Sequence, residues 1–453
     1  MSAAQSTAIP VAPVSVPSFR EALLVWAKIG VLGFGGPAGQ IALMHRIVVD
    51  EKGWIDETRF LHALNYCMLL PGPEATQLAA YVGWLLHGTR GGVAAGVLFV
   101  LPGFFVILAL SIAYVLLGDL PVVEGLLFGL KAAVLAIVAE ALLRVSRRAL
   151  KTRAAALIAV AAFVAIAFLS VPFPLIVAGA AVAGVLMSWT AHAGSGAAAS
   201  LVTPSDAPSQ AGQSPWRDSL RAAIVWLVIW FAPVAALALL FGGRHVFTAE
   251  ALFFSKVAVV TFGGAYAVLA YVAQQAVEAY HWLRPDEMLT GLGLAETTPG
   301  PLILVLVFVG FLAGYRAETA FDPLVAGTIG ATATLWVTFV PSFLFIFAGA
   351  PFIERLRQNR FLTGALAAVT AAVVGVIANL ALWFGLHVLF AEVGEAAFGP
   401  LELPLPQPAS FDTAAAAIAL AAGVALIRFR IGIVTVLAAA AATGAISRMA
   451  GLG

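Results

Sequence analysis

The stretch FREALLVWAKIGVLGFGGPAGQIALMHRIVVDEKGWIDETRFLHALNYCMLLPGP, residues 19–73, decides the fold of this chain because it occurs twice. Its Phe-Gly-Gly at residues 34–36 returns at residues 262–264, and its Pro-Gly-Pro at residues 71–73 returns at residues 299–301. Each motif returns after 228 residues (262 minus 34, and 299 minus 71). Solenoid repeats have periods of only about 20–50 residues, so this spacing predicts two homologous halves and not a repeat array.

The composition is that of a membrane protein. The chain has 453 residues, of which 62% are hydrophobic and only 10% are charged, and its mean hydropathy is +1.01. Soluble domains carry about 25% charged residues. The apolar runs are long enough for helices, which need about 20 residues to cross a bilayer, and the short alternating strands of a membrane barrel are absent. We therefore predict an all-α polytopic membrane protein.

Several function classes are disfavoured by the sequence. A net charge of +1 implies no nucleic-acid partner, and the single cysteine, Cys67, excludes an intrachain disulfide. The sequence has no phosphate-binding loop, no dinucleotide fingerprint and no HExxH motif. We therefore expect no cofactor, no metal site and no enzymatic activity.

Glycine and proline break two helices in each half. In the first half the apolar segment that starts near Arg20 ends at Gly33-Phe34-Gly35-Gly36-Pro37. A second break follows at Pro71-Gly72-Pro73 and opens a new helix that we expect to run through about Leu86. Glycine frees the backbone, and proline interrupts the helical hydrogen bonds. Irregular backbone at membrane depth is tolerated only where protein or a water-filled cavity satisfies it. The breaks therefore predict broken or re-entrant helices around a substrate path.

Basic residues predict the orientation, because Lys and Arg are enriched in cytoplasmic loops. In the first half the basic run is Arg144, Arg147, Arg148, Lys151 and Arg153, and the loop one span earlier is acidic. In the second half the equivalent loop is basic instead, with Arg355, Arg357 and Arg360, and the next loop, residues 391–410, is acidic. Matching loops then lie on opposite sides, which predicts inverted-topology repeats. Glu140 and Arg144 have the i,i+4 spacing of a helical ion pair.

Four segments follow from this pattern. Residues 1–17 are rich in Pro, Ala and Ser and predict a disordered tail. Residues 18–189 form the first half, residues 190–215 a cytoplasmic linker, and residues 216–453 the second half. We expect a multi-pass protein of the cell inner (plasma) membrane, with the N-terminus and the linker inside and the C-terminus outside.

The breaks also predict an anion site. Inverted repeats with broken helices are typical of secondary transporters, whose half-helix N-termini point at anions near the midplane. Lys28 and Lys256 occupy the same repeat position, and a lysine within an apolar segment is costly and usually functional, although snorkelling to an interface is the alternative. The expected substrate-binding residues are Lys28, Gly35, Gly36, Pro71, Gly72, Pro73, Thr76, Gln77, Lys256, Gly263, Gly264, Pro299, Gly300 and Pro301.

These motifs resemble the chromate ion transporter family in its long, two-domain form. The resemblance rests on Phe34-Gly35-Gly36-Pro37, on Trp54, on Leu70-Pro71-Gly72-Pro73 with Thr76-Gln77, and on their second-half counterparts, and it covers nearly the whole chain. It implies export of chromate from the cytoplasm, driven by the proton gradient or membrane potential, which gives chromate resistance. Sulfate is the close structural analogue, and a sulfate or other oxyanion carrier is the alternative.

Two residues depart from the family pattern. Glu74 stands where the family often has Asn, and Gln40 stands where it often has His. A carboxylate beside an anion site repels the substrate unless it is protonated, so Glu74 is a candidate proton-coupling group, with a water-exposed vestibule carboxylate as the alternative. Glu296, in an apolar half-helix of the second half, is a second candidate, or it pairs with a lysine.

Other readings stay open at this point. An anion channel is a rival, although two equivalent half-sites and no filter-like loop favour a carrier. A membrane enzyme is disfavoured because the chain has no His/Asp/Cys cluster, and an assembly scaffold is the remaining rival. Gly92 and Gly96 form a GxxxG spacing that indicates a helix contact, so a homodimer is a candidate assembly.

Overall fold

A computed structural model describes residues 17–190, 215–262, 264–352, 359–398 and 401–450. Nearly all of the predicted tail and linker, and the predicted site residue Gly263, lie outside this part of the chain. The described chain is almost entirely helical, with one antiparallel hairpin that pairs Val393 with Pro406.

In the first half the helices are α1 (Phe19–Leu32), α2 (Gly36–His45), α3 (Glu57–Cys67), α4 (Glu74–Leu117), α5 (Pro121–Ala149), α6 (Arg153–Leu169) and α7 (Phe173–Thr190). The second half continues with α8 (Pro215–Phe241), α9 (Val246–Val260), α10 (Ala265–Gln274), α11 (Pro285–Thr297), α12 (Val305–Arg316), α13 (Pro323–Gly349) and α15 (Arg360–Leu389). It ends with β1 (Val393–Phe398), β2 (Leu401–Pro406), α16 (Thr413–Ile427) and α17 (Ile433–Met449).

Six described helices are long and apolar enough to cross a membrane: α4, α5, α7, α8, α13 and α15. Four shorter apolar helical segments accompany them, at Arg153–Leu169, Leu302–Arg316, Thr413–Ile427 and Ile433–Met449. The outer helices turn apolar side chains outward, and on α8 the exposed fraction of Leu239 reaches 87%. Such a surface suits lipid and not water. These features confirm the predicted all-α polytopic membrane protein.

The long helix α4 is two helices in succession. His87 (φ −138°, ψ 25°) and Gly88 (φ 62°, ψ −155°) leave the helical region inside it. The dihedral angles of Gly88 strain any residue with a side chain, although no neighbouring atom lies within 4 Å of a Cβ at this position. A half-helix from Glu74 therefore turns back near Leu86, where the sequence predicted its end, and a full span follows.

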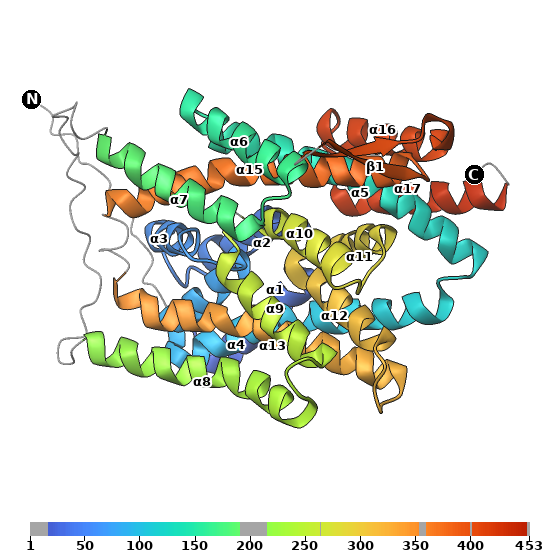
Figure 1. The fold of residues 1–453 in the computed structure, drawn as a ribbon. Helices are drawn as coiled ribbons and strands as arrows, with labels where there is room; N and C mark the ends of the chain where they lie inside the picture. The colour runs from blue at the N-terminus through green and yellow to red at the C-terminus, as the bar shows by residue number, and fades with distance from the viewer. Residues whose placement is uncertain (1–16, 191–214, 263, 353–358, 399–400, 451–453) are drawn as a thin grey trace, which may run out of the picture.

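The helices form two groups with the broken elements between them. Figure 1 shows α4, α8 and α13 along one edge of the molecule and α6, α7 and α15 to α17 along the other. The shorter helices α1, α2, α9, α10, α11 and α12 lie in the middle (Figure 1). The breaks are thus enclosed by protein on both sides.

The two halves of the sequence interleave in space. Helix α5 packs against α16 and α17 of the second half, and α15 packs against α6 and α7 of the first half. The α5–α17 crossing is close because it is built on glycine: a Cβ on Gly129 would lie 1.9 Å from the Ala440 carbonyl oxygen. Each half therefore completes its helical packing only with the other.

Candidate functional site

The four breaks meet at the centre of the protein and bond to each other across the halves. The backbone N–H of Gly72 donates to the Thr261 carbonyl at 2.8 Å, and the N–H of Gly300 donates to the Gly33 carbonyl at 2.9 Å. Gly33 and Thr261 are 228 residues apart, as are Gly72 and Gly300. The second break of each half thus bonds to the first break of the other half, so the interrupted backbone is satisfied by protein as membrane depth requires.

Glycine is required at the second break of each half. Gly72 has φ 117° and Gly300 has φ 93°, a region that residues with a side chain rarely adopt. The space is also filled, because a Cβ on Gly72 would lie 2.9 Å from Nε2 of Gln77. The Pro-Gly-Pro motif therefore encodes a turn that no larger residue makes without strain.

A small cavity of about 20 Å³ lies between the breaks. Its lining residues come mainly from the first turns of the helices that follow each break: Pro37, Gln40, Gly72, Pro73, Glu74, Ala75, Thr261, Gly264, Ala265, Pro301, Leu302 and Ile303. First-turn N–H groups have no partner within their helix and carry partial positive charge. The cavity has room for about one water, so a larger ligand requires the breaks to separate.

Two buried amides hold the breaks in place. Nε2 of Gln40 donates to the Gly33 carbonyl at 3.2 Å and to the Gly300 carbonyl at 2.5 Å, and Nε2 of Gln77 donates to the Pro71 carbonyl at 2.6 Å. In the part of the chain that the structure describes, Oε1 of both amides and the Thr76 hydroxyl are buried without a hydrogen-bond partner. Gln40 lines the cavity, and Thr76 and Gln77 directly follow the lining residue Ala75 in α4.

Gln40 is the residue that sequence reasoning left out of the expected site. It was singled out only as a departure from the family pattern, although the structure uses it to bridge the two halves. A signal was present: Gln40 follows Pro37 by three residues, much as Gln77 follows Pro73 by four. A glutamine about one turn after a glycine-proline break therefore indicates a side chain, such as that of Gln40, that bonds to the backbone of the break.

The expected residues divide into two groups. Gly72, Pro73, Gly264 and Pro301 line the cavity, and Thr76, Gln77, Pro71 and Gly300 lie close behind that lining. Lys28 and Lys256 are exposed on the outer faces of α1 and α9 and do not line the cavity. Gly35 and Gly36 (φ 88° and 67°) and Pro299 also lie outside the lining.

The two candidate proton carriers differ in setting. Glu74 begins α4 and lines the cavity. Glu296, on α11, is 3% exposed and lies outside the lining, where its Oε1 accepts a hydrogen bond from the Tyr266 hydroxyl at 2.5 Å. Its observed partner is thus a tyrosine and not a lysine. Among the described residues no group of three His, Cys, Asp or Glu could hold a metal ion.

One histidine pairs with two carboxylates between α2 and α3. His45, the last residue of α2, bonds to Glu57, and its Nδ1 lies 3.3 Å from Asp50. The hydrogen bond to Glu57 raises the pKa of His45 above its usual value; burial opposes this, and the charges of Glu57 and Asp50 add to it. The protonated imidazole therefore ties α2 to the start of α3.

The raised pKa of His45 predicts a pH-dependent stability. The folded state binds the proton more tightly than the unfolded chain, so the stabilisation is full below the unfolded pKa and is lost as pH rises through the folded pKa. Because the carboxylates are more than half exposed, we expect only about 0.2–1 kcal/mol. Thermal unfolding across that pH range, compared for the wild type and His45→Gln, should show a difference that shrinks as pH rises. His281→Gln, at a ring that bonds a backbone carbonyl and no carboxylate in the hydrogen bonds of the described residues, is the control variant.

This architecture is that of a multi-pass membrane transporter. It combines apolar spans with half-helices that end at breaks, and the breaks enclose a central cavity. The chain matches the family described as chromate transporter over residues 20–185 and 248–445, and it belongs to that family. This is a family of transport proteins, so the chain is not an enzyme.

The relatives cover most of the chain. A "Chromate transport protein" of Pseudomonas aeruginosa is 33% identical over 83% of this chain and 82% of its own length. A "Chromate transport protein" of Cupriavidus metallidurans is 26% identical over 80% of this chain and 81% of its own length. An "Uncharacterized transporter" of Methanocaldococcus jannaschii is 28% identical over 82% of this chain and 86% of its own length. No solved structure gives a significant match.

Proposed function

We propose that this protein exports chromate from the cytoplasm, coupled to the proton gradient or membrane potential, and so confers chromate resistance. The observation that carries the proposal is the convergence of four helix starts on one cavity, at Pro37, Pro73, Gly264 and Pro301. Helix N-termini favour small anions because they present unpaired N–H groups and partial positive charge. The names of the curated relatives identify chromate as the anion to test first.

The proposed chromate-binding site is formed by the residues that line the cavity. Chromate fits there only when the breaks move apart and the cavity widens. The N–H groups of residues 74–76 and 302–303 bind the oxyanion oxygens, with the Thr76 hydroxyl as a further donor. Lys28 and Lys256 act at a distance in this scheme: their positive charge raises the local concentration of the anion, since both lie outside the lining. Their effect on transport should therefore weaken at high salt, whereas that of the cavity groups should not.

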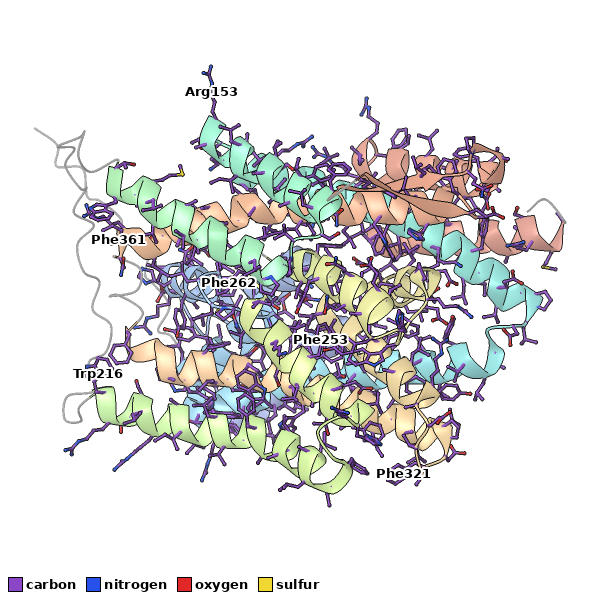
Figure 2. The ribbon with its side chains drawn as sticks, in the orientation of Figure 1. Arg153, Trp216, Phe253, Phe262, Phe321 and Phe361 are labelled. Carbon is purple, nitrogen blue, oxygen red and sulfur yellow. The ribbon has the colours of Figure 1, made fainter. Side chains whose placement is uncertain are left out.

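The proposed cycle uses inverted repeats. Two observations support a two-fold relation between the halves: the reciprocal hydrogen bonds at 228-residue spacing, and the crosswise packing of α5 and α15. In Figure 2, Arg153, Trp216 and Phe361 lie toward the left of the molecule and Phe321 toward the lower right, so the starts of α6, α8 and α15 share a side. We assign that side, with the N-terminus, to the cytoplasm of the inner (plasma) membrane. The C-terminus is assigned to the outside.

Glu74 is the proposed coupling group at the cavity. Its carboxyl group lines the space that the anion must enter, so a charged Glu74 and a bound dianion repel each other. Anion binding then favours the protonated form, so the dianion and one proton leave the cytoplasm together. The pair carries a net charge of −1, which a membrane potential that is negative inside drives outward. Glu296 is the second candidate through its hydrogen bond with Tyr266.

The test is uptake of radiolabelled chromate by inverted membrane vesicles, with and without an imposed proton gradient. We expect saturable, gradient-dependent uptake by the wild type. Glu74→Gln should keep uptake but lose its dependence on the gradient, and Lys28→Ala and Lys256→Ala should raise the half-saturating concentration at low salt only. Lys151→Ala, an exposed lysine of a basic loop, is the matched control.

Three outcomes would count against the proposal. Uptake that never saturates would indicate a channel. Stronger transport of sulfate than of chromate would make the protein a carrier of another oxyanion. An absence of chromate uptake, in vesicles that contain folded protein, would remove the substrate assignment.

A further inference from the structure

Another buried carboxyl group, that of Glu250, lies apart from the central cavity. Glu250, on α9, is 0% exposed, and both of its carboxylate oxygens lack a hydrogen-bond partner in the described part of the chain. An ionised carboxylate in such a place is costly, so the group stays neutral by holding a proton. The first half has Ala22 at the equivalent position, 228 residues earlier, so this carboxyl group occurs once in the protein.

The surrounding helices make room for this carboxyl group. Oε2 of Glu250 lies against Gly330 of α13, where a Cβ would come within 2.8 Å of it. Gly330 in turn touches Gly310 of α12, whose own Cβ would meet the Gly330 carbonyl at 2.9 Å and the Thr334 hydroxyl at 2.2 Å. Two glycines and a threonine thus form the space into which the Glu250 side chain extends.

From this point a row of buried hydroxyl groups follows one face of α13. Thr334, Thr338 and Ser342 are spaced four residues apart, are at most 2% exposed, and have unpartnered hydroxyl oxygens within the described chain. In contrast, Thr328 and Thr332 on the same helix bond back to carbonyls four residues earlier, at 2.8 and 2.7 Å. The buried hydroxyls are therefore available to other partners.

The row ends at the central site. Oγ of Ser342 lies 3.5 Å from the position of a Cβ on Gly72, and Gly72 lines the cavity. The path from Gly330 to Ser342 covers about 18 Å of helix, at 1.5 Å per residue. Successive hydroxyls are about 6 Å apart along the axis, a gap that one bridging water closes.

We propose that Glu250 is a proton-binding site of this transporter, connected to the central cavity by the Thr334–Thr338–Ser342 face of α13. In each cycle its carboxylic acid gives one proton to a water held by the Thr334 hydroxyl and becomes a carboxylate. A proton from the opposite side of the membrane restores the acid. The coupling role rests on the proposed function, but the proton site itself does not.

The titratable groups on the helices that pack against α9 do not pair with Glu250 among the described residues. Helix α13 has none; α12 carries Tyr315 and Arg316, the latter bonded to Glu287; and α10 carries Tyr266 and Tyr271. On α8 the charged groups are Arg217, Asp218 and Arg221, near its first residues, and α9 has only the exposed Lys256 and the capping His245. None of these forms an ion pair or hydrogen bond with Glu250 among the described residues.

The first test is infrared titration of the full chain reconstituted in lipid. We expect the carbonyl stretching band of a protonated carboxylic acid, at a pH where exposed carboxyls are ionised, and loss of part of that band in Glu250→Gln. Glu318→Gln, at an exposed loop carboxylate, should leave the band unchanged. Glu250→Asp should keep a shifted band, which excludes misfolding as the cause. An identical spectrum for the wild type and Glu250→Gln would overturn the proton site even if chromate transport fails.

The second test addresses coupling. In proteoliposomes, Glu250→Gln should lose the stimulation of chromate uptake by a proton gradient and keep downhill uptake. Thr338→Val should slow gradient-driven uptake with the infrared band intact, whereas Thr332→Val, an exposed threonine of the same helix, should not. Unchanged gradient stimulation in Glu250→Gln would remove this residue from coupling. A sodium gradient that replaces the proton gradient would also overturn it.

Discussion

Replacing Glu287 by alanine is expected to lower the free energy of unfolding by about 1–3 kcal/mol, the cost of leaving the hydrogen-bond donors around one buried carboxylate without their acceptor. The Arg316 side chain is 38% exposed, so water compensates part of the lost ion pair. Glu287, near the start of α11, is 0% exposed. Its Oε1 accepts from Arg316 Nη2 at 2.5 Å and from the Tyr114 hydroxyl at 3.0 Å. Its Oε2 accepts from Arg316 Nη1 at 2.7 Å and from the backbone N–H of Arg284 at 2.8 Å. One carboxylate therefore joins α4, α11 and α12.

The loss is large because four donors would lose their acceptor together. Burial alone raises the pKa of Glu287, but the hydrogen bonds from Arg316 and Arg284 reverse this and leave the pKa below its usual value. The carboxylate is thus charged at neutral pH, and its removal leaves the Arg316 guanidinium without its main partner. Glu287→Gln should cost less, because the amide oxygen still accepts some of these bonds.

Denaturant unfolding of the purified protein in detergent measures this prediction. Glu318→Ala, at an exposed loop carboxylate, should change the free energy of unfolding by no more than about 0.5 kcal/mol. The double variant Glu287→Ala with Arg316→Ala should be less destabilised than the sum of the two single variants. A Glu287→Ala protein as stable as Glu318→Ala would contradict the proposed role of the ion pair.

The fold was predictable where glycine and proline dictate backbone geometry. The 228-residue spacing, the four breaks and the end of a half-helix near Leu86 could all be read from the sequence. The i,i+4 pair of Glu140 and Arg144 was predicted and is confirmed, with Arg144 Nε 3.1 Å from Glu140 Oε1. Each of these signals consists of residue types and their spacing in the sequence, so it can be recognised without the tertiary contacts.

The acidic loop at residues 391–410 was predicted without regular structure, but it contains the hairpin of β1 and β2. Prolines in β2 argue against a strand in sequence analysis, because proline cannot donate to a sheet. They are tolerated here because the two-stranded hairpin has free edges. The strand pairing, which matches Gly394 with Leu405, therefore had no clear sequence signal.

The site was only partly predictable because its geometry depends on pairing between the halves. The hydrogen bond from Gly72 to Thr261 joins residues almost two hundred positions apart, and no local rule identifies Thr261 as the acceptor. Lys28 and Lys256 were expected at the site because they share a repeat position, but both lie outside the cavity lining. A shared repeat position does not reveal which face of a half-helix points inward. The sequence did not single out Glu250, because its surroundings come from α13, a helix far along the chain that packs against α9.

Replacing Gly72 or Gly300 by alanine is expected to reduce the initial rate of chromate uptake by about tenfold or more. Alanine at these positive φ values costs at least about 1–2 kcal/mol, and each 1.4 kcal/mol in a barrier or a population is about tenfold in rate. The added methyl group also presses on Gln77 Nε2 in the first case and on Leu304 Cδ1, 3.2 Å away, in the second. Both changes displace the N–H group that bonds the other half of the protein.

Uptake by vesicles with matched amounts of folded protein measures this effect, and Gly53→Ala separates backbone strain from the site. Gly53 also has a positive φ, 58°, but its Cβ position has no atom within 4 Å, and it lies outside the cavity. If strain alone lowered transport, Gly53→Ala would be as slow as the other two. If Gly72→Ala and Gly300→Ala both transport at the rate of Gly53→Ala, the substrate does not pass between the breaks. Equal losses at Gly72 and Gly300 are the result that a two-fold site requires, because each glycine makes the same bond to the opposite half.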